Sequence, residues 1–293
     1  MNNYILSCCS TADLSREHFE KRNIAWLCFH FFLDGKEYID DLGESLSFDE
    51  FYKAIAEGAD TRTSQINSEE YYAHFRKFLE DGKDVLHLCL SSGLSGTVNS
   101  ARIAADQLAE EFPNNKVVVE DSLAASSGFG LLMETLADMR DEGKTLDELV
   151  AFLQDNILRM RHWFFTTDLS TFIRGGRVSK TSGFVGTLLG ICPLLDVDAG
   201  GHLTPREKVR SKKKVIARIV EKMAEEAGTD YSGKCFISNS ACMEDAEAVA
   251  SLVKETFPHL NGDVVINSIG TTIGSHTGPG TVALFYWSKE NRV

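Results

Sequence analysis

Residues 85–97 read VLHLCLSSGLSGT, and this stretch decides the fold class that the sequence predicts. An unbroken apolar run ends in a turn of serines and glycines, and residues 96–111 then follow the pattern of an amphipathic helix. A second apolar run, KVVVED at 116–121, also precedes a helical pattern. Apolar strands that lead directly into helices are typical of buried parallel strands in βαβ units. The first half of the chain is therefore predicted to be an α/β unit with a parallel sheet.

The second half of the chain has a different order of elements. The turn at Ala199-Gly200-Gly201 follows an apolar strand and indicates a hairpin, so strand directions are mixed there. We predict two α/β domains, an N-terminal parallel-sheet domain over residues 1–160 and a C-terminal mixed-sheet domain over residues 161–293. Strands are predicted at 4–9, 24–32, 85–91, 116–120, 164–167, 192–198, 234–239, 263–269 and 281–287. Helices are predicted at 48–57, 68–80, 96–111, 128–142, 145–161, 211–228 and 243–257.

The composition excludes several classes of protein. The 293 residues carry a formal net charge of −13, and an acidic surface repels nucleic-acid phosphates and anionic membranes. No segment has the roughly 18 uncharged apolar residues of a membrane-spanning helix, and the first residues lack a signal-peptide pattern. Seven cysteines without a CxxC pair indicate neither a disulfide framework nor a zinc site. We expect a cytoplasmic protein with no metal, no nucleic-acid partner and no stable membrane insertion.

Two glycine-containing stretches match cofactor motifs only in part. Gly128-Phe129-Gly130 lacks the third glycine of a dinucleotide fingerprint. In GGRVSKT at 175–181, Ser179 stands where a P-loop has the glycine before its lysine. The sequence therefore predicts no cofactor.

Two polar loops precede predicted helices at the sheet edge where α/β proteins bind ligands. Thr63 and Ser64 lie just before the helix at 68–80, and Ser95 and Gly96 open the helix at 96–111. Capping of the helix at 68–80 is the simpler interpretation of the first loop, but capping alone does not explain its run of polar residues. Free backbone N–H groups and hydroxyls at a helix start also make a binding place for an anion.

A third segment, residues 270–280, contains four glycines and a proline around His276, and we expect an exposed, sharply folded loop. The imidazole is either structural or a hydrogen-bonding partner for a carboxylate, neutral or charged. A serine hydrolase or acyltransferase that uses Ser95 and His276 is the alternative. It is disfavoured because Thr97 stands where the nucleophile motif GxSxG has its second glycine.

One basic stretch interrupts the acidic sequence, REKVRSKKK at 206–214. A solvated start of a helix is the usual explanation of such a run. A site for an anion or a protein partner, as in a phosphate-sensing or interaction protein, is the functional one.

Six short motifs, in this order and spacing, resemble the DegV family, and the resemblance spans nearly the whole chain. The motifs are STADL at 10–14, TSQ at 63–65, LSGT at 94–97, GGR at 175–177, KVR at 208–210 and GSHTGPG at 274–280. Two positions depart from the family pattern: Cys9 stands where the family usually has Asp, and Cys192 where it usually has Lys.

The resemblance implies a two-domain lipid-binding protein that holds one long-chain fatty acid in a tunnel between its domains and is not itself an enzyme. Similar proteins of Gram-positive bacteria are acyl-carrier subunits of a fatty acid kinase, in which a separate ATP-binding subunit phosphorylates the carboxylate. By this resemblance Thr63 and Ser95 hold the carboxylate with His276 close by, and Arg177 and Arg210 face the phosphate or the kinase. The implied ligand-binding residues are Thr63, Ser64, Ser95, Gly96, His276 and Thr277.

Overall fold

The computed structural model describes residues 3–179 and 190–293. The strands are β1 Tyr4–Cys9, β2 Ile24–Leu27, β3 His30–Leu33, β4 Lys36–Ile39, β5 Thr61–Ser64, β6 Asp84–Cys89, β7 Val117–Asp121, β8 Met160–Thr166, β9 Ile191–Val197, β10 Leu203–Arg210, β11 Phe236–Asn239, β12 Val265–Ser268 and β13 Thr281–Trp287. The α-helices are α1 Arg16–Lys21, α2 Phe48–Ala56, α3 Ser68–Glu80, α4 Thr97–Glu111, α5 Ser126–Asp141, α6 Leu146–Asn156, α7 Ser170–Arg174, α8 Lys212–Ala227, α9 Met243–Thr256 and α10 Thr271–Thr277, and the 3₁₀ turns are η1 Ser10–Ala12 and η2 Ile157–Arg159.

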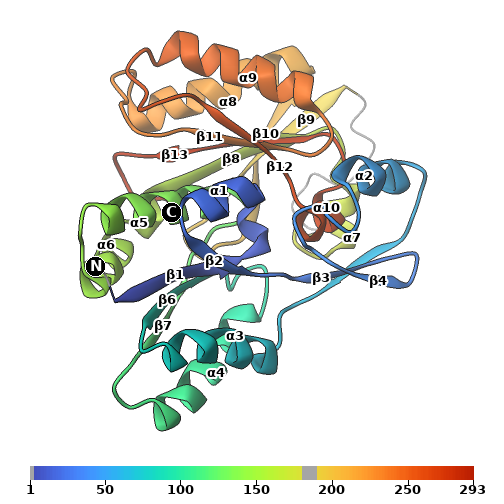
Figure 1. Ribbon diagram of the computed structural model, residues 1–293. Helices are drawn as coiled ribbons and strands as arrows, with labels where there is room; N and C mark the ends of the chain where they lie inside the picture. Colours follow the sequence, from blue (N-terminus) through green and yellow to red (C-terminus); the bar gives the residue numbers. More distant parts are fainter. Residues whose placement is uncertain (1–2, 180–189) are drawn as a thin grey trace.

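Two main sheets form the molecule (Figure 1). Four parallel strands have the order β2-β1-β6-β7, and six mixed strands have the order β10-β9-β8-β13-β11-β12. The predicted α/β fold, with a parallel-sheet domain and a mixed-sheet domain, is confirmed. The hairpin predicted at 199–201 is also present, because β9 and β10 pair antiparallel across that turn.

Helix α5 lies between the two sheets (Figure 1). Eleven of its 16 residues are buried, which is expected of a helix that is apolar on nearly all sides. It packs against β1 of the parallel sheet and against β8, β11 and β13 of the mixed sheet. The two domains therefore share a core helix, and their division at residue 160 stays a prediction.

The remaining long helices cover the outer faces of the sheets. Helices α3 and α4 pack on β6 and β7, and α8 and α9 pack on the mixed sheet (Figure 1). Within the two described ranges, no helix combines the length and the apolar character that crossing a bilayer requires.

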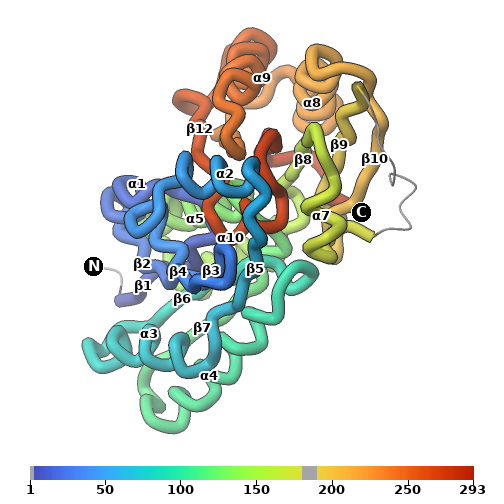
Figure 2. Tube along the Cα trace, turned by 90° about the vertical axis from the view of Figure 1, so that its right-hand side faces the viewer, coloured from blue at the N-terminus to red at the C-terminus, as the bar shows by residue number. Residues whose placement is uncertain are grey.

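A small antiparallel sheet, with the strand order β4-β3-β5, corrects the prediction of one strand at 24–32. The apolar run is continuous, but it belongs to two sheets. At the break, the Phe29 N–H donates to Ser10 Oγ at 3.1 Å, and the Phe29 carbonyl accepts from the Asp40 N–H at 2.8 Å. These bonds turn the chain out of the parallel sheet and toward α10 (Figure 2).

The helix predicted over 145–161 is also too long. Thr145 and Glu148 form a capping box at its start, but α6 ends at Asn156 and β8 begins at Met160. All residues of β8 except Arg161 are buried, and the strand pairs with β13; this long-range pairing overrides the helical pattern.

The packing of α5 predicts that Gly130→Ala destabilises the protein, although alanine favours helix by about 1 kcal/mol over glycine. A β-carbon at Gly130 would lie 2.7 Å from the carbonyl oxygen of Ala12, a backbone atom that cannot move aside. We expect a net loss of about 1–3 kcal/mol in the free energy of unfolding, measured by urea denaturation. Thr135→Ala on the same helix is the control and should change it by about 1 kcal/mol or less. A more stable Gly130→Ala protein would contradict this account of the packing.

Candidate functional site

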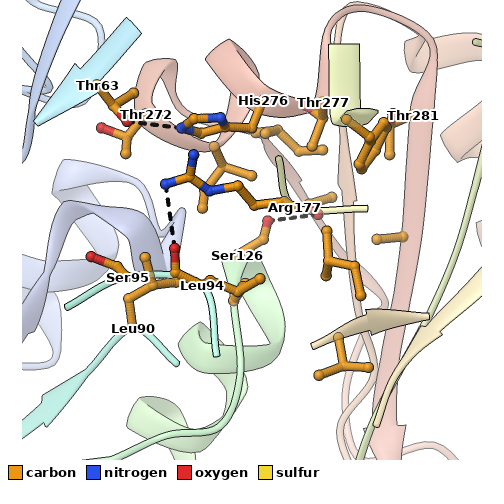
Figure 3. Close-up of a pocket in the computed structure, with 18 of the residues that line it drawn as sticks. Thr63, Leu90, Leu94, Ser95, Ser126, Arg177, Thr272, His276, Thr277 and Thr281 are labelled. Carbon is orange, nitrogen blue, oxygen red and sulfur yellow. Dashed lines mark hydrogen bonds between the residues drawn. The ribbon is translucent and has the colours of Figure 1, made fainter. Parts of the chain in front are cut away.

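A cavity of ≈ 510 Å³ is lined by residues from both halves of the chain (Figure 3). This volume lies within the range of sites for small organic ligands. Most of its wall is apolar, and the polar side chains of Thr63, His276 and Arg177 converge on one region of it. The apolar side chains of the wall include Leu90, Leu94, Phe164, Phe172, Ile273 and Phe285.

Thr63 reaches the cavity from a strand, where the sequence suggested a loop before a helix. In β5, Thr61 and Thr63 are half-buried while Arg62 and Ser64 are exposed, the alternation of a strand with one covered face. Thr63 Oγ1 lies 2.8 Å from His276 Nε2. Strand pairing with β3 thus fixes which way the Thr63 hydroxyl points.

The segment predicted as an exposed loop at 270–280 is instead the largely buried helix α10 and the short turn that leads into β13. Two buried carboxylates hold the start of this helix: Asp13 Oδ1 accepts from the Gly270 N–H at 3.0 Å, and Asp40 Oδ1 accepts from Thr271 Oγ1 at 2.8 Å. Burial raises the pKa of both carboxyls. The glycines made the segment look like a loop, but the partners that stabilise its helix lie more than 200 residues away.

His276 is a neutral imidazole at neutral pH. Burial, with a smaller contribution from the charge of Arg177, lowers its pKa from 6.5 to about 4. Its Nδ1 is buried against Gly175 and has no hydrogen-bond partner among the residues described. Because Nδ1 is buried, the imidazole contributes to the cavity through Nε2 and its contact with Thr63.

Ser95 lies in the turn that leads into α4, where the N–H groups of Leu94 and Ser95 donate to the Ser91 carbonyl. The Ser95 Oγ accepts from the Thr97 N–H at 3.3 Å. In the described structure the imidazole of His276 is hydrogen-bonded to Thr63 and not to Ser95. The alternative of a serine nucleophile activated by His276 is therefore not supported.

The two arginines singled out in the sequence lie in different places. Arg177 lines the cavity, donates to the Gly175 carbonyl at 2.6 Å and to the Leu94 carbonyl at 3.4 Å, and has a pKa lowered by burial. Arg210 is exposed at the end of β10 and is not among the lining residues. A role for Arg210 in contacting a phosphate or a partner stays a prediction.

The other predicted residues, Ser64, Gly96 and Thr277, also line the cavity. Ser126 lines the cavity but was not predicted as a site residue. It follows the carboxyl end of β7, as Ser95 follows that of β6, and this position could have identified it. The cavity is also lined by His162, Ser238 and Thr281 from strands, and the sequence carries no signal for these three residues.

Cys9 and Cys192, which depart from the family pattern, are buried outside the cavity lining. Cys9 Sγ lies 3.3 Å from the Tyr71 hydroxyl, which in turn lies 2.7 Å from Thr97 Oγ1 at the start of α4. Cys9 therefore contacts the start of α4 through Tyr71 and does not line the cavity. Cys192 lies opposite Val209 in the antiparallel hairpin of β9 and β10.

The fold and the cavity define an α/β protein with a mainly apolar cavity whose polar groups gather in one region. A family model described as "Uncharacterised protein, DegV family" matches residues 9–289. The chain belongs to the DegV family.

Known relatives cover nearly all of this chain. The DegV domain-containing protein YteA of Lactococcus lactis is 41% identical over 286 residues, 97% of each chain. A DegV lipid binding protein from Thermotoga maritima has a TM-score of 0.85 with 30% identity and 100% coverage of both chains. A DegV family protein from Thermus thermophilus, described as binding fatty acid, has a TM-score of 0.88 with 28% identity, covering 98% of this chain and 99% of that one.

The lowered pKa of His276 predicts a pH-dependent contribution to stability. The unfolded chain takes up a proton on this imidazole near pH 6.5, whereas the folded protein does so only near pH 4. As the pH falls from 6.5 toward 4, protonation of this imidazole in the unfolded chain progressively lowers the free energy of unfolding. The loss from this group is about 2 kcal/mol at pH 5. Chemical denaturation of lipid-free protein at pH 7 and pH 5 should show a loss of stability that is about 2 kcal/mol smaller in His276→Gln. Equal losses in both proteins would contradict the buried, neutral state of His276.

Proposed function

We propose that this protein binds one long-chain fatty acid in the cavity, with the carboxylate near Thr63, Ser95 and His276 and the chain along the apolar wall. One observation carries the proposal: an apolar cavity has hydroxyl, imidazole and guanidinium groups gathered in one region. Its similarity to structures described as lipid-binding and fatty-acid-binding supports the same ligand class.

The head group would be held by neutral donors aided by one cation. If His276 Nε2 carries the imidazole proton, it donates to Thr63 Oγ1 and leaves the Thr63 hydroxyl proton free for a carboxylate oxygen. The Ser95 hydroxyl and the free N–H groups at the start of α4 supply further donors. Arg177 adds a positive charge that offsets part of the cost of removing the carboxylate from water.

The acyl chain would supply most of the affinity. Each buried methylene contributes about 0.8 kcal/mol, so a 16-carbon chain offers on the order of 11 kcal/mol before the costs of association. Polar residues at the head then determine orientation more than they determine whether a lipid binds.

We further propose that the bound carboxylate is presented to a separate ATP-binding kinase subunit, which forms the acyl phosphate. Ser64 and Gly96 line the cavity and are exposed, so the head-group region has an opening toward the surface. The chain has no complete P-loop of its own. Arg177 and Arg210 would contact the phosphate or the kinase, in a protein that works in the cytoplasm.

Lipid binding and hydrolysis can be measured together on wild type, Thr63→Val, Ser95→Ala and His276→Ala. Mass spectrometry of denatured wild-type protein should detect co-purified fatty acid. Each variant should bind about tenfold to a hundredfold more weakly, because a hydrogen bond to a charged group contributes roughly 1.5–3 kcal/mol. Residual binding should persist, since the apolar wall is intact.

The exposed Ser251→Ala on α9 is the matched control and should bind as wild type does. None of these proteins should hydrolyse a chromogenic fatty-acid ester. Ester turnover by wild type that disappears in Ser95→Ala would overturn the proposal in favour of an enzyme.

A second prediction concerns Arg210, which is exposed and outside the cavity lining. Arg210→Glu should slow acyl-phosphate formation with the cognate kinase several-fold and leave the dissociation constant for fatty acid unchanged. Lys21→Glu, an exposed charge reversal on α1, serves as the control and should affect neither measurement. Loss of fatty-acid binding in Arg210→Glu would show that the residue is structural.

A further inference from the structure

The wall of the cavity includes a polar patch around Ala283. Thr281, Ala283 and Phe285 of β13 all line the cavity, as expected of alternate residues on one face of a strand. Across the sheet, Ala283 pairs with Phe164 on one side and with Ser238 on the other. The methyl group of Ala283 is the smallest side chain in this part of the wall.

The register places polar neighbours on three sides of Ala283. Ser238 is directly opposite, Thr281 is two residues away on the same face, and His162 is opposite Phe285 and so diagonal to Ala283. Directly opposed β-carbons are about 5 Å apart and diagonal neighbours about 7–8 Å. One small functional group above Ala283 would therefore be close to all three polar side chains.

Thr281 has a hydroxyl without a hydrogen-bond partner among the described residues. The residue is 2% exposed, and its Oγ1 has no hydrogen-bond partner in the part of the chain that the structure describes. Buried polar atoms are nearly always hydrogen-bonded, because an unpaired one loses its water without compensation. Valine would fill the same space without that loss. Oγ1 is buried in the wall in the observed rotamer, and a rotation about χ1 exchanges it with the γ-methyl group, so that the hydroxyl can turn to a ligand in the cavity.

His162 is held in one tautomer by an arginine from the end of the chain. Arg292 Nη1 lies 3.1 Å from His162 Nδ1, and a guanidinium only donates, so Nδ1 accepts and the imidazole proton is on Nε2. Nε2 is buried against Gly128 and has no partner among the described residues. The patch therefore holds a second unpaired polar group, in this case an N–H donor.

Ser126 adds an acceptor beside Ser238. Its Oγ donates to Asp13 Oδ2 at 2.5 Å and lies 2.9 Å from Ser238 Oγ, which leaves lone pairs on both hydroxyls (Figure 3). Ser126 has a φ of 53°, a left-handed conformation that is uncommon outside glycine and tends to occur at functional sites.

We propose that this patch recognises an oxygen atom on the acyl chain, and that the preferred ligands are long-chain hydroxy fatty acids with the hydroxyl above Ala283. The inference rests on the proposed function and specifies its ligand. Thr281 is the specificity-determining residue, and the His162 and Ser126–Ser238 groups make the surroundings polar.

A polar patch and a purely apolar tunnel predict opposite preferences between a hydroxy fatty acid and its parent acid. In a purely apolar tunnel, a chain hydroxyl loses its water without replacement, so a hydroxy acid binds about tenfold or more weakly than its parent. With a hydrogen-bonding partner, one positional isomer should bind about 2- to 10-fold more tightly than the parent.

The experiment compares octadecanoic acid with a series of its monohydroxy positional isomers, by displacement of a fluorescent fatty acid from lipid-free protein. For wild type we expect one isomer to bind more tightly than octadecanoic acid. Thr281→Val keeps the shape and breaks no described side-chain hydrogen bond, so it should fold normally and reverse that preference. Thr281→Ser keeps a hydroxyl and should restore it. Thr256→Val, whose hydroxyl bonds the Leu252 carbonyl on α9 outside the cavity lining, should leave the preference as in wild type.

The outcomes separate this inference from the proposed function. Weaker binding of every hydroxy isomer to wild type, or an unchanged preference in Thr281→Val, would overturn the polar patch and leave fatty-acid binding intact. Failure of octadecanoic acid and all isomers to bind would remove the proposed function and the inference with it.

Discussion

The backbone N–H of Gly270 donates to Asp13, and the Thr271 hydroxyl donates to Asp40, over sequence separations of 257 and 231 residues. Both carboxylates are buried, and burial raises their pKa because charge is costly away from water. Hydrogen bonds from the start of α10 offset that cost. The position of His276, further along α10, depends on these two contacts from the first half of the chain.

Asp13 also connects this helix to the centre of the molecule. Its second carboxylate oxygen accepts from Ser126 at the start of α5, and Ser126 contacts Ser238 on the mixed sheet. One buried carboxylate thus joins η1, α5, α10 and β11. The cavity lies beside this junction, so the walls that line it are held by polar contacts at their meeting point and by apolar packing elsewhere.

The sequence allowed prediction of features that depend on local pattern. Apolar strands such as β6 and the helix α3 were found within a few residues, since periodicity and capping report on local structure. The break of the apolar run at Phe29 and the helical state of 271–277 were not predictable, because bonds from Ser10, Asp13 and Asp40 determine them. The same limit applies to the site: Thr63 and His276 were both recognised as candidates, whereas their direct contact across 213 residues exists only in the folded chain.

The burial of His276 and its contact with Thr63 fit ligand binding better than activation of a serine nucleophile. A base that activates a serine must accept its proton, and that requires an imidazole near the serine with a pKa close to the working pH. His276 has a pKa of about 4, and its Nε2 contacts Thr63. A weakly basic, neutral imidazole is a poor proton acceptor. If its proton is on Nε2, the Thr63 hydroxyl accepts that N–H and keeps its own proton for another acceptor. Under the proposed function, the same burial that makes His276 a poor base lets Thr63 donate to the carboxylate of the ligand.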